Sequence, residues 1–437
     1  MNPLRTGLRF SLATLLACSS VGLTQAQQLG PDFVNDFTLT NLLQVPGVPS
    51  PYGGLEFKAG DPNKLLITGF SEDPLSAIYE IDVTRDAQGH VDGFTGIASV
   101  FANAPQATGG LKYGPGGVLF FTTYPDNTLR QFLPGSTTVD KVVDLGLLGA
   151  APSTGGLAIT PSGFPGAGEL KITSYNAGFW YSADLVPDGM GTFDVANMTL
   201  QLPPLGNGIG PESFEFVDST YPAFANQSVL ICEWTAERVS AYEIDANGDP
   251  INNTRRDFVL TGPVGDFWPQ GSTLDPMTGD FLFSDWGSGD SVIVIQPVVT
   301  PIGTNYCLST INSSGFAATI AASGSASISA NDLVLGATGL PINNDQPGTF
   351  LAGPTQATIP FFDGFLCVAP NGLQRFAVIN VSTNGTITEP IDYNTSAAGG
   401  LNVVAGMTYN YQRWNRDPAA MGLNANFSDG LAIVHTP

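Results

Sequence analysis

Five oxygen-bearing side chains between residues 212 and 285 could hold a cation. They are four carboxylates and one amide: Glu212, Glu233, Asp266, Gln270 and Asp285. Ligand sets made only of oxygen suit Ca²⁺ better than zinc. The same residues could equally be solvated or turn-capping acids, because the chain carries 38 acidic residues. A calcium site is therefore predicted only if the fold brings these side chains to one face.

Other catalytic chemistries find little support in the residue pattern. Only two histidines occur, His90 and His435, and neither is near a candidate nucleophile or the other histidine in the sequence. This argues against a Ser–His triad and against a His-rich zinc site. There is no G-x-S-x-G, no C-x-x-C and no phosphate-binding glycine loop followed by Lys. A carboxylate pair for glycoside hydrolysis stays open, because its separation depends on the fold.

Composition favours a turn-rich, all-β, exported protein. The 437 residues include 52 glycines and 33 prolines, and only 12% are charged. This length allows two or three domains, each with its own core. The formal net charge of −23 and the lack of a basic run exclude nucleic acid as an expected partner.

The N-terminal stretch predicts export. Two arginines precede the apolar run FSLATLLACSSVGL, and small residues follow up to Ala26. This pattern predicts a signal peptide over residues 1–26, cleaved after Ala26. A second reading is a lipobox that ends at Cys18, which would tether the mature protein through a lipid. Beyond residue 26 no apolar run is long enough to span a membrane.

The remaining cysteines fit an oxidising compartment. Cys307 and Cys367 both lie in the last third of the chain and are expected to pair. Cys232 lies inside the apolar run SVLICEW, where we expect a buried, unreactive thiol.

Five segments of the sequence repeat one pattern. Each has an opening of the Gly-Gly-Leu-x-aromatic type, a short turn, and an apolar strand that ends in an aromatic residue. The segments open at Gly53, Gly109, Gly155, Glu212 and Gln270, at intervals of 46 to 58 residues. Four short strands per unit at this period predict a β-propeller over residues 31–298, with five blades counted and six considered. The last blade lacks an outer strand, which residues 33–43 could supply.

The repeat pattern resembles the NHL and SMP-30/gluconolactonase-like propellers, some of them six-bladed, over about residues 50–297. The resemblance rests on the x-Gly-Leu openings and on SDWGSGDSVIVI, where Asp285 takes the acid position. It implies a divalent metal held by acid and amide side chains at the openings of the innermost strands. Three of the five openings here are glycines, and only Glu212 and Gln270 offer ligand atoms. The chain therefore departs from the pattern of the lactonase enzymes.

The segment FLFSDWGSGD, residues 281–290, predicts a strand end and turn. Asp285 is expected to accept backbone N–H bonds there, with Gly287 and Gly289 providing the turn. An aromatic residue occupies the next position in all five repeats, and we expect this column to pack between blades. The column is Phe70, Tyr124, Tyr175, Trp234 and Trp286.

Residues 303–437 form a different module without lysine, and alternating patterns such as SISANDLVL predict a β-sandwich. The stretches GTNYC, GPTQATIPFFDGFLCV, YQRWNRDPA and NFSDGLAI resemble the C-terminal β-module of exported planctomycete proteins. That resemblance also places a cysteine in each of the first two motifs. In YQRWNRDP, Tyr411, Arg413, Trp414 and Arg416 could grip a sugar or carboxylate. The alternative is a core strand with Trp414 inside and Arg416 paired with Asp417 or Asp429.

Two functions follow as expectations. The first is an exported, non-enzymatic propeller that binds a polymer or protein, with the β-sandwich as an accessory or surface-anchoring module. The second is a metal-dependent hydrolase of the lactonase or esterase type, with Glu212 as the main ligand. The three Gly-Gly-Leu openings favour the binding protein over the enzyme.

Overall fold

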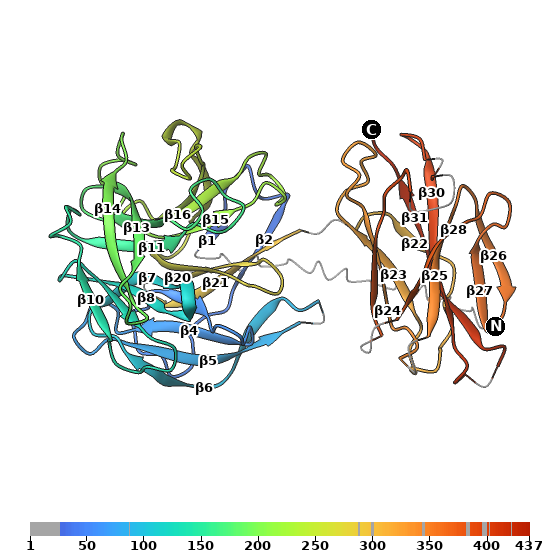
Figure 1. The fold of residues 1–437 in the computed structure, drawn as a ribbon, viewed down its shortest axis with the longest axis horizontal. Helices are drawn as coiled ribbons and strands as arrows, with labels where there is room; N and C mark the ends of the chain where they lie inside the picture. The colour runs from blue at the N-terminus through green and yellow to red at the C-terminus, as the bar shows by residue number, and fades with distance from the viewer. Residues whose placement is uncertain are drawn as a thin grey trace, which may run out of the picture. The chain divides into compact units, whose positions relative to one another are not determined.

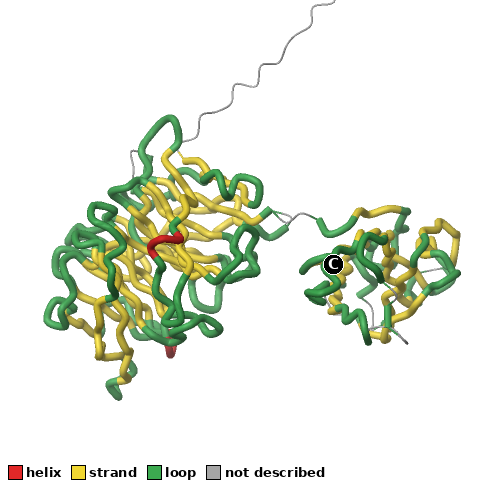
Figure 2. The backbone as a smooth tube through the Cα atoms, turned by 90° about the horizontal axis from the view of Figure 1, so that it is seen from above, coloured by secondary structure: helices red, strands yellow, loops and turns green. Residues whose placement is uncertain are grey.

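The computed structural model describes residues 27–86, 88–286, 289–298, 301–342, 346–381, 385–395, 400–401, 403–420 and 422–437. The predicted signal peptide with Cys18, and the turn residue Gly287, lie outside these residues. The described residues are strands and loops with two short 3-10 turns, η1 (Pro115–Gly117) and η2 (Asn252–Thr254) (Figure 2). The all-β prediction is confirmed. In the described ranges, no helix has the length and apolarity to cross a membrane.

The chain divides into two compact units, Met1–Val298 and Val299–Pro437. The described part of the first unit forms five antiparallel sheets, whose strands are labelled in Figure 1 where space allows. The first sheet consists of β3 (Leu55–Phe57), β4 (Lys64–Gly69), β5 (Ala77–Arg85) and β6 (Val91–Asn103). The second consists of β7 (Ala107–Tyr113), β8 (Leu119–Thr123), β9 (Thr128–Phe132) and β10 (Lys141–Asp144). The third consists of β11 (Thr154–Ile159), β12 (Leu170–Ser174), β13 (Phe179–Pro187) and β14 (Phe193–Leu200).

The last two sheets of this unit include strands from the start of the described chain. The fourth is β15 (Pro211–Val217), β16 (Ser228–Glu233), β17 (Arg238–Glu243), β18 (Arg256–Thr261) and β1 (Gln27–Leu29), and the fifth is β19 (Pro269–Leu274), β20 (Phe281–Asp285), β21 (Ser291–Pro297) and β2 (Phe37–Asn41). Strand β2 pairs with β21 from Phe37↔Pro297 to Asn41↔Ile293, and so supplies the outer strand expected from residues 33–43. The pairing of β1 with β18 was not foreseen from the sequence.

The first strands of the five sheets form a closed ring, and we call them the inner strands. Strand β3 contacts β7, β7 contacts β11, β11 contacts β15, β15 contacts β19, and β19 contacts β3. This is a propeller-like arrangement, as the repeat predicts. The openings of the inner strands and the ends of the second strands therefore share one face of the ring.

Hydroxyl groups on the second strands join neighbouring sheets. The hydroxyl of Thr173 on β12 donates to the carbonyl of Glu212 on β15 at 2.9 Å, and that of Ser284 on β20 donates to the carbonyl of Gly53 beside β3 at 2.6 Å. Thr122 on β8 makes the same bond to Gly155 on β11. Cys232 occupies the equivalent position of the fourth sheet, where it is free and fully buried, which confirms its expected burial. These bonds give inner-strand carbonyls a donor from the neighbouring sheet.

The second unit contains a five-stranded and a three-stranded sheet that share one apolar core, including Phe350, Tyr411, Leu335 and Ile320. The larger sheet is β22 (Thr304–Tyr306), β31 (Ala425–Val434), β30 (Thr408–Arg416), β25 (Pro347–Gly353) and β28 (Gln374–Asn380). The smaller is β23 (Thr319–Ser323), β24 (Val334–Thr338) and β29 (Ile387–Pro390). Strands β26 (Gln356–Phe361) and β27 (Gly364–Val368) form a separate hairpin.

The disulfide between Cys307 and Cys367 forms as expected. Residues 411–416 of the YQRWNRDP segment lie on β30, and their burial agrees with the expected core strand except at Trp414 and Arg416. Arg413 is fully buried and donates to Asn415 at 2.7 Å and to the carbonyl of Ile379 at 2.8 Å. Trp414 is only half-buried. The fully buried Tyr411 and Arg413 are therefore core residues and do not reach a sugar at the surface.

The expected pairing of Arg416 is wrong. Within the described ranges, Arg416 is exposed and forms no ion pair. The carboxylate of Asp417 accepts the backbone N–H of Ser313 at 2.9 Å, and that of Asp429 accepts the N–H of Ile320 at 2.8 Å. The two acids therefore accept backbone N–H groups and are not paired with the Arg416 guanidinium.

Replacing Thr173 with Val should lower the free energy of unfolding of the first unit by about 1–3 kcal/mol. The substitution removes a donor from the Glu212 carbonyl and an acceptor from the Gly156 N–H, which lies 2.7 Å from the Thr173 hydroxyl. Denaturant unfolding followed by tryptophan fluorescence measures this loss, because four of the five tryptophans lie in the first unit. Thr40→Val on the exposed side of β2 is the matched control and should change stability by less than about 0.5 kcal/mol. Equal effects of the two substitutions would contradict the role of the hydroxyl bonds.

Candidate functional site

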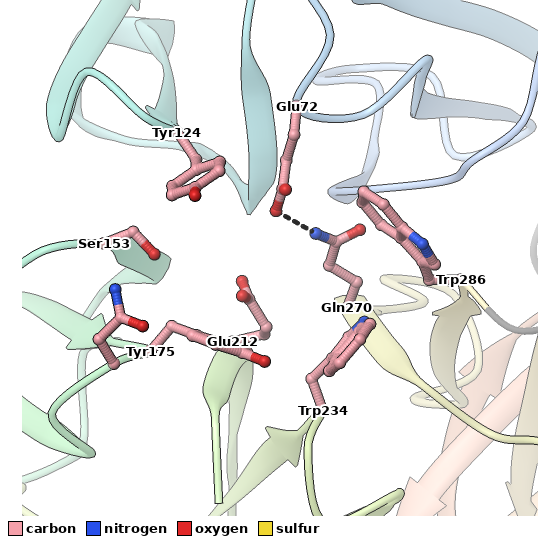
Figure 3. Close-up of a pocket in the computed structure, with 9 residues that line it drawn as sticks. Glu72, Tyr124, Ser153, Tyr175, Glu212, Trp234, Gln270 and Trp286 are labelled. Atoms are coloured by element: carbon pink, nitrogen blue, oxygen red, sulfur yellow. Dashed lines mark hydrogen bonds between the residues drawn. The ribbon is translucent and has the colours of Figure 1, made fainter. Parts of the chain in front are cut away.

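A pocket of about 310 Å³ lies at the face of the ring where the inner strands open (Figure 3). All five sheets contribute to its lining, either from the opening of an inner strand or from the loop after a second strand. The lining residues are Glu72, Tyr124, Ser153, Tyr175, Asn176, Glu212, Trp234, Gln270 and Trp286. Polar groups and aromatic rings are thus combined in one concave site, as in many small-molecule sites.

An acid–amide network forms the floor of the pocket. Gln270 donates from Nε2 to Glu72 Oε1 at 3.1 Å and to the hydroxyl of Thr108 at 3.3 Å. Thr108 in turn donates to Glu72 Oε1 at 3.2 Å. Figure 3 shows Glu72, Glu212 and Gln270 directed toward the same space from three different sheets. The network holds the amide of Gln270 so that its other polar atom, Oε1, remains available.

Two buried acceptor atoms of this floor have no protein partner. In the part of the chain that the structure describes, neither Glu212 Oε2 nor Gln270 Oε1 makes a hydrogen bond. The two side chains belong to residues that are 3% and 1% exposed. A buried polar atom without a partner costs roughly 1–3 kcal/mol, so such atoms call for an explanation by ligand or solvent.

Burial raises the pKa of Glu212 well above its usual range, and the nearby Glu72 carboxylate raises it further. A hydrogen bond with Thr108 acts in the opposite direction. Burial also raises the pKa of Glu72, against the effect of its bonds with Thr108 and Gln270. Glu212 therefore favours the uncharged carboxyl, which offers one O–H donor as well as acceptor capacity.

Two glycines, Gly109 and Gly155, provide the room that the side chain of Glu212 needs. A Cβ atom at Gly109 or at Gly155 would lie 2.8 Å from Glu212 Oε2. At Gly155 it would also lie 2.6 Å from the backbone carbonyl oxygen of Pro211. No side chain can therefore be accommodated at either position without moving an inner strand. The Gly-Gly openings that lack metal ligands thus have a steric role: they let the inner strands close around one carboxyl group.

Glu72 reaches the pocket from a turn with an unusual backbone conformation. Its φ is +68°, in the left-handed region that residues with a side chain rarely adopt. The turn is held by the backbone N–H of Glu72, which donates to the carbonyl of Ala107 in the neighbouring sheet at 2.8 Å. Such conformations persist where surrounding contacts enforce them and are enriched at functional sites. Glu72 was not predicted from the sequence, where the available signal is an acid two positions after the aromatic residue of the first repeat.

Four of the five aromatic residues of the repeat column form the wall of the pocket, and Phe70 is the exception. Tyr124 is 41% exposed, and Tyr175, Trp234 and Trp286 are half-buried. The ring of Trp234 stacks on Trp268 with centroids 5.1 Å apart and meets Tyr175 edge-on at 5.9 Å. Tyr175, Trp234 and Trp286 follow strands of three neighbouring sheets, and Trp234 also approaches Trp286 at 6.5 Å, so the predicted packing between blades is confirmed for these three rings. The positions directly after β8, β12, β16 and β20 also bring four of these side chains to the pocket, which the sequence did not predict.

The five candidate cation ligands do not gather at one place. Glu212 and Gln270 line the pocket, whereas Asp266 and Asp285 line a separate cavity with Gln27. Glu233 is fully buried and accepts from Arg238 Nε at 2.6 Å and from the Tyr242 hydroxyl. Across the described ranges, no three His, Cys, Asp or Glu side chains are grouped as metal ligands. As placed in the described structure, these five residues do not form a common Ca²⁺ site.

Asp285 has a structural environment. Its carboxylate accepts the backbone N–H of Trp268 at 2.9 Å and the side-chain amide of Gln27 at 2.9 Å. This backbone donor comes from the loop before β19, whereas the donors that the sequence predicts in the following turn, at Gly287, lie outside the described residues. Asp285 thus connects β1 and the loop before β19 to the end of β20.

A charged cluster closes the ring axis below the pocket. The ammonium of Lys112 on β7 pairs with Glu56 on β3 at 3.2 Å and with Glu215 on β15, and it donates to the carbonyl of Ser272 on β19 at 3.0 Å. Burial raises the pKa of Glu56 to about 7 even though Lys112 favours its charged form. Glu215 and Lys112 lie three residues beyond the pocket openings of their strands, or about 10 Å. The pocket therefore has a closed floor.

No protein-family model matches the sequence, and no curated protein matches it. Solved structures with a similar chain trace include the PQQ domain of a pyranose dehydrogenase from Coprinopsis cinerea, at 10% identity and a TM-score of 0.36 over 63% of this chain and 97% of that one. Others are a 6-phosphogluconolactonase-like protein from Bacteroides uniformis and virginiamycin B lyase from Staphylococcus aureus. The first is 12% identical, with a TM-score of 0.33 over 90% of this chain and 89% of that one. The second is 11% identical, with a TM-score of 0.31 over 60% of this chain and 99% of that one. Likeness at this level carries no argument about activity.

Replacing Glu212 with Gln should remove a pH-dependent loss of stability. A carboxyl whose folded pKa is raised keeps its proton in the folded state, so its contribution is fully present below the unfolded pKa. This contribution to the free energy of unfolding is lost as the pH rises from about 4.5 toward the raised pKa of the folded state, by up to about 1.4 kcal/mol per pH unit. Unfolding free energies of both proteins between pH 5 and 8 measure the difference.

We expect the stability of the wild type to fall relative to Glu212→Gln as the pH increases. The contributions of Glu72 and Glu56 are present in both proteins and largely cancel in this comparison. Asp32→Asn, at an exposed position, is the control and should follow the wild-type pH profile. Parallel profiles for wild type and Glu212→Gln would show that the carboxyl is ionised throughout.

Proposed function

We propose that the protein is an exported five-bladed β-propeller that binds the end of a neutral polyhydroxylated polymer, such as a glycan, in the pocket of Figure 3. The observation that carries this proposal is the pair of buried, unpartnered oxygens on Glu212 and Gln270 beneath an aromatic wall. In the same proposal, residues 303–437 are a β-sandwich with an accessory or surface-anchoring role.

A hydroxylated ligand matches the polar floor. Its O–H groups can donate to Gln270 Oε1 and to Glu212 Oε2, and its oxygens can accept from the protonated carboxyl of Glu212. Forming these bonds would remove the cost of leaving both oxygens unpaired. The binding energy would therefore come from groups that the folded protein already holds in place.

The aromatic wall and the charge of the site favour a neutral ligand. The flat apolar faces of a sugar ring can lie against Trp234 and Trp286, as flat groups do on aromatic side chains. Anions are disfavoured by the net charge of −23. A cation would need an ionised floor to balance it, whereas burial keeps Glu212 uncharged.

The size of the pocket indicates a chain end. A volume of about 310 Å³ is at the lower limit for ligand sites, and the Lys112 cluster closes the axis below it. One terminal residue of a polymer can enter such a pocket, while the rest of the polymer extends outward. A polymer threaded through the ring has no path past Lys112.

Trp234→Ala and Gln270→Ala should each weaken binding of a recognised sugar at least about tenfold, or 1.4 kcal/mol. Tryptophan fluorescence titrations with glucose, galactose, mannose and xylose, and with their short oligosaccharides, measure this. The first substitution removes stacking area and the second removes the acceptor. Phe70→Leu is the matched control, because Phe70 belongs to the same repeat column but does not line the pocket; it should change affinity less than about twofold.

Two outcomes would overturn the proposal. One is the absence of a response to every neutral sugar by a folded protein. The other is saturable binding of choline with none of the sugars, which would identify the aromatic wall as a cation site. Release of free sugar from a bound oligosaccharide would show a hydrolase and would contradict the non-enzymatic binding protein that the sequence favours.

A further inference from the structure

The second unit has a pocket of its own, between the β26–β27 hairpin and the larger sheet. Its volume is about 360 Å³, and most of its lining is apolar. Leu351 and Trp414 form its base on the sheet, Phe427 lies beside them on β31, and Phe361 and Phe362 come from the tip of the hairpin. This pocket does not depend on the propeller site or on its proposed ligand.

Several large apolar side chains around this pocket remain in contact with water. Phe361, Phe362 and Val378 are 47%, 43% and 64% exposed. The rings of Phe361 and Phe362 lie 4.6 Å apart and approach Phe427 at 6.2 and 6.5 Å. Clustered apolar surface around a concave site is typical of a binding surface and costs solubility when left uncovered.

The hairpin that forms the outer wall is fixed in place. The Cys307–Cys367 disulfide attaches β27 to the segment after β22, and Gln412 bonds the backbone of β27 at both Cys367 and Phe365, each at 2.8 Å. At the tip, the backbone N–H of Asp363 donates to the carbonyl of Ala425 at 3.1 Å. The pocket is therefore preformed, which lowers the entropic cost of binding.

One charged side chain lines this pocket, and it is a cation. Arg375 lies on the edge strand β28 and is exposed. Within the described ranges it has no hydrogen-bond or ion-pair partner, in a chain where acidic residues outnumber basic ones 38 to 15. An unpaired guanidinium at the edge of an apolar pocket complements a carboxylate on an apolar body.

We propose that this pocket binds a free alkyl carboxylate of medium length. The alkyl chain would lie among Phe361, Phe362, Trp414 and Phe427, and the carboxylate would pair with Arg375. Each methylene removed from water contributes about 0.8 kcal/mol, so affinity should increase with chain length until the pocket is filled. The guanidinium selects the anionic head group.

Isothermal titration calorimetry of the full protein with decanoate tests this proposal. We expect one molecule of decanoate to bind, butyrate to bind at least tenfold more weakly, and decyltrimethylammonium not to bind at this site. Arg375→Gln should weaken decanoate binding at least tenfold. Arg416→Gln replaces another exposed arginine of the same unit that does not line the pocket, and it should leave the affinity within twofold.

Phe362→Ser, at the exposed hairpin tip, should also weaken binding at least tenfold without unfolding the unit. The proposal is overturned if decanoate does not bind below its micelle concentration. It is equally overturned if decyltrimethylammonium binds as well as decanoate and Arg375→Gln has no effect, because the pocket would then be an apolar surface without selection for an anion.

Discussion

The close approach of five inner strands around one axis is the constraint on which the first unit depends. Strands this close leave no room for a Cβ at Gly109 or Gly155, where it would lie 2.8 Å from the Glu212 carboxyl. They also bring carbonyl groups of one sheet within reach of hydroxyls on the next, as for Thr173 and Glu212. The glycines, the hydroxyl bonds and the buried acid are thus three consequences of one closure.

The same closure determines the chemistry of the pocket. It removes water from Glu212 and so raises the pKa of the carboxyl and favours its uncharged form, while the aromatic residues after the second strands, such as Trp234, remain accessible at the rim. Below, Lys112 balances the acids that face it across the axis. A neutral, hydrogen-bonding floor under an aromatic wall suits a hydroxylated ligand better than a metal ion, which binds carboxyl groups in their ionised form.

Much of this architecture could be predicted from the sequence, because the repeat fixes strand order and alternation within each sheet. The completion of the fifth sheet by β2 follows from the missing strand. The direction of the aromatic column could not be predicted, since burial between sheets and exposure at the rim require the same residue types. Glu72 was missed because its place in the pocket depends on a left-handed turn. The five candidate metal ligands do not form one site, because Glu233 is bonded to Arg238 and Asp285 is bonded to Gln27. These contacts between strands could not be predicted from the spacing of the residues in the sequence.

The titration of the Glu212 carboxyl is the most direct test of this account. Carbon-13 NMR of protein labelled at the glutamate carboxyl groups, compared with Glu212→Gln, assigns the resonance and follows its protonation. A midpoint well above the usual glutamate value, shifting when a bound sugar engages the floor of the pocket, is the predicted result. A midpoint near 4.5 would contradict the account, because the ring would then enclose a charged, solvated carboxylate and the pocket would lack its uncharged floor.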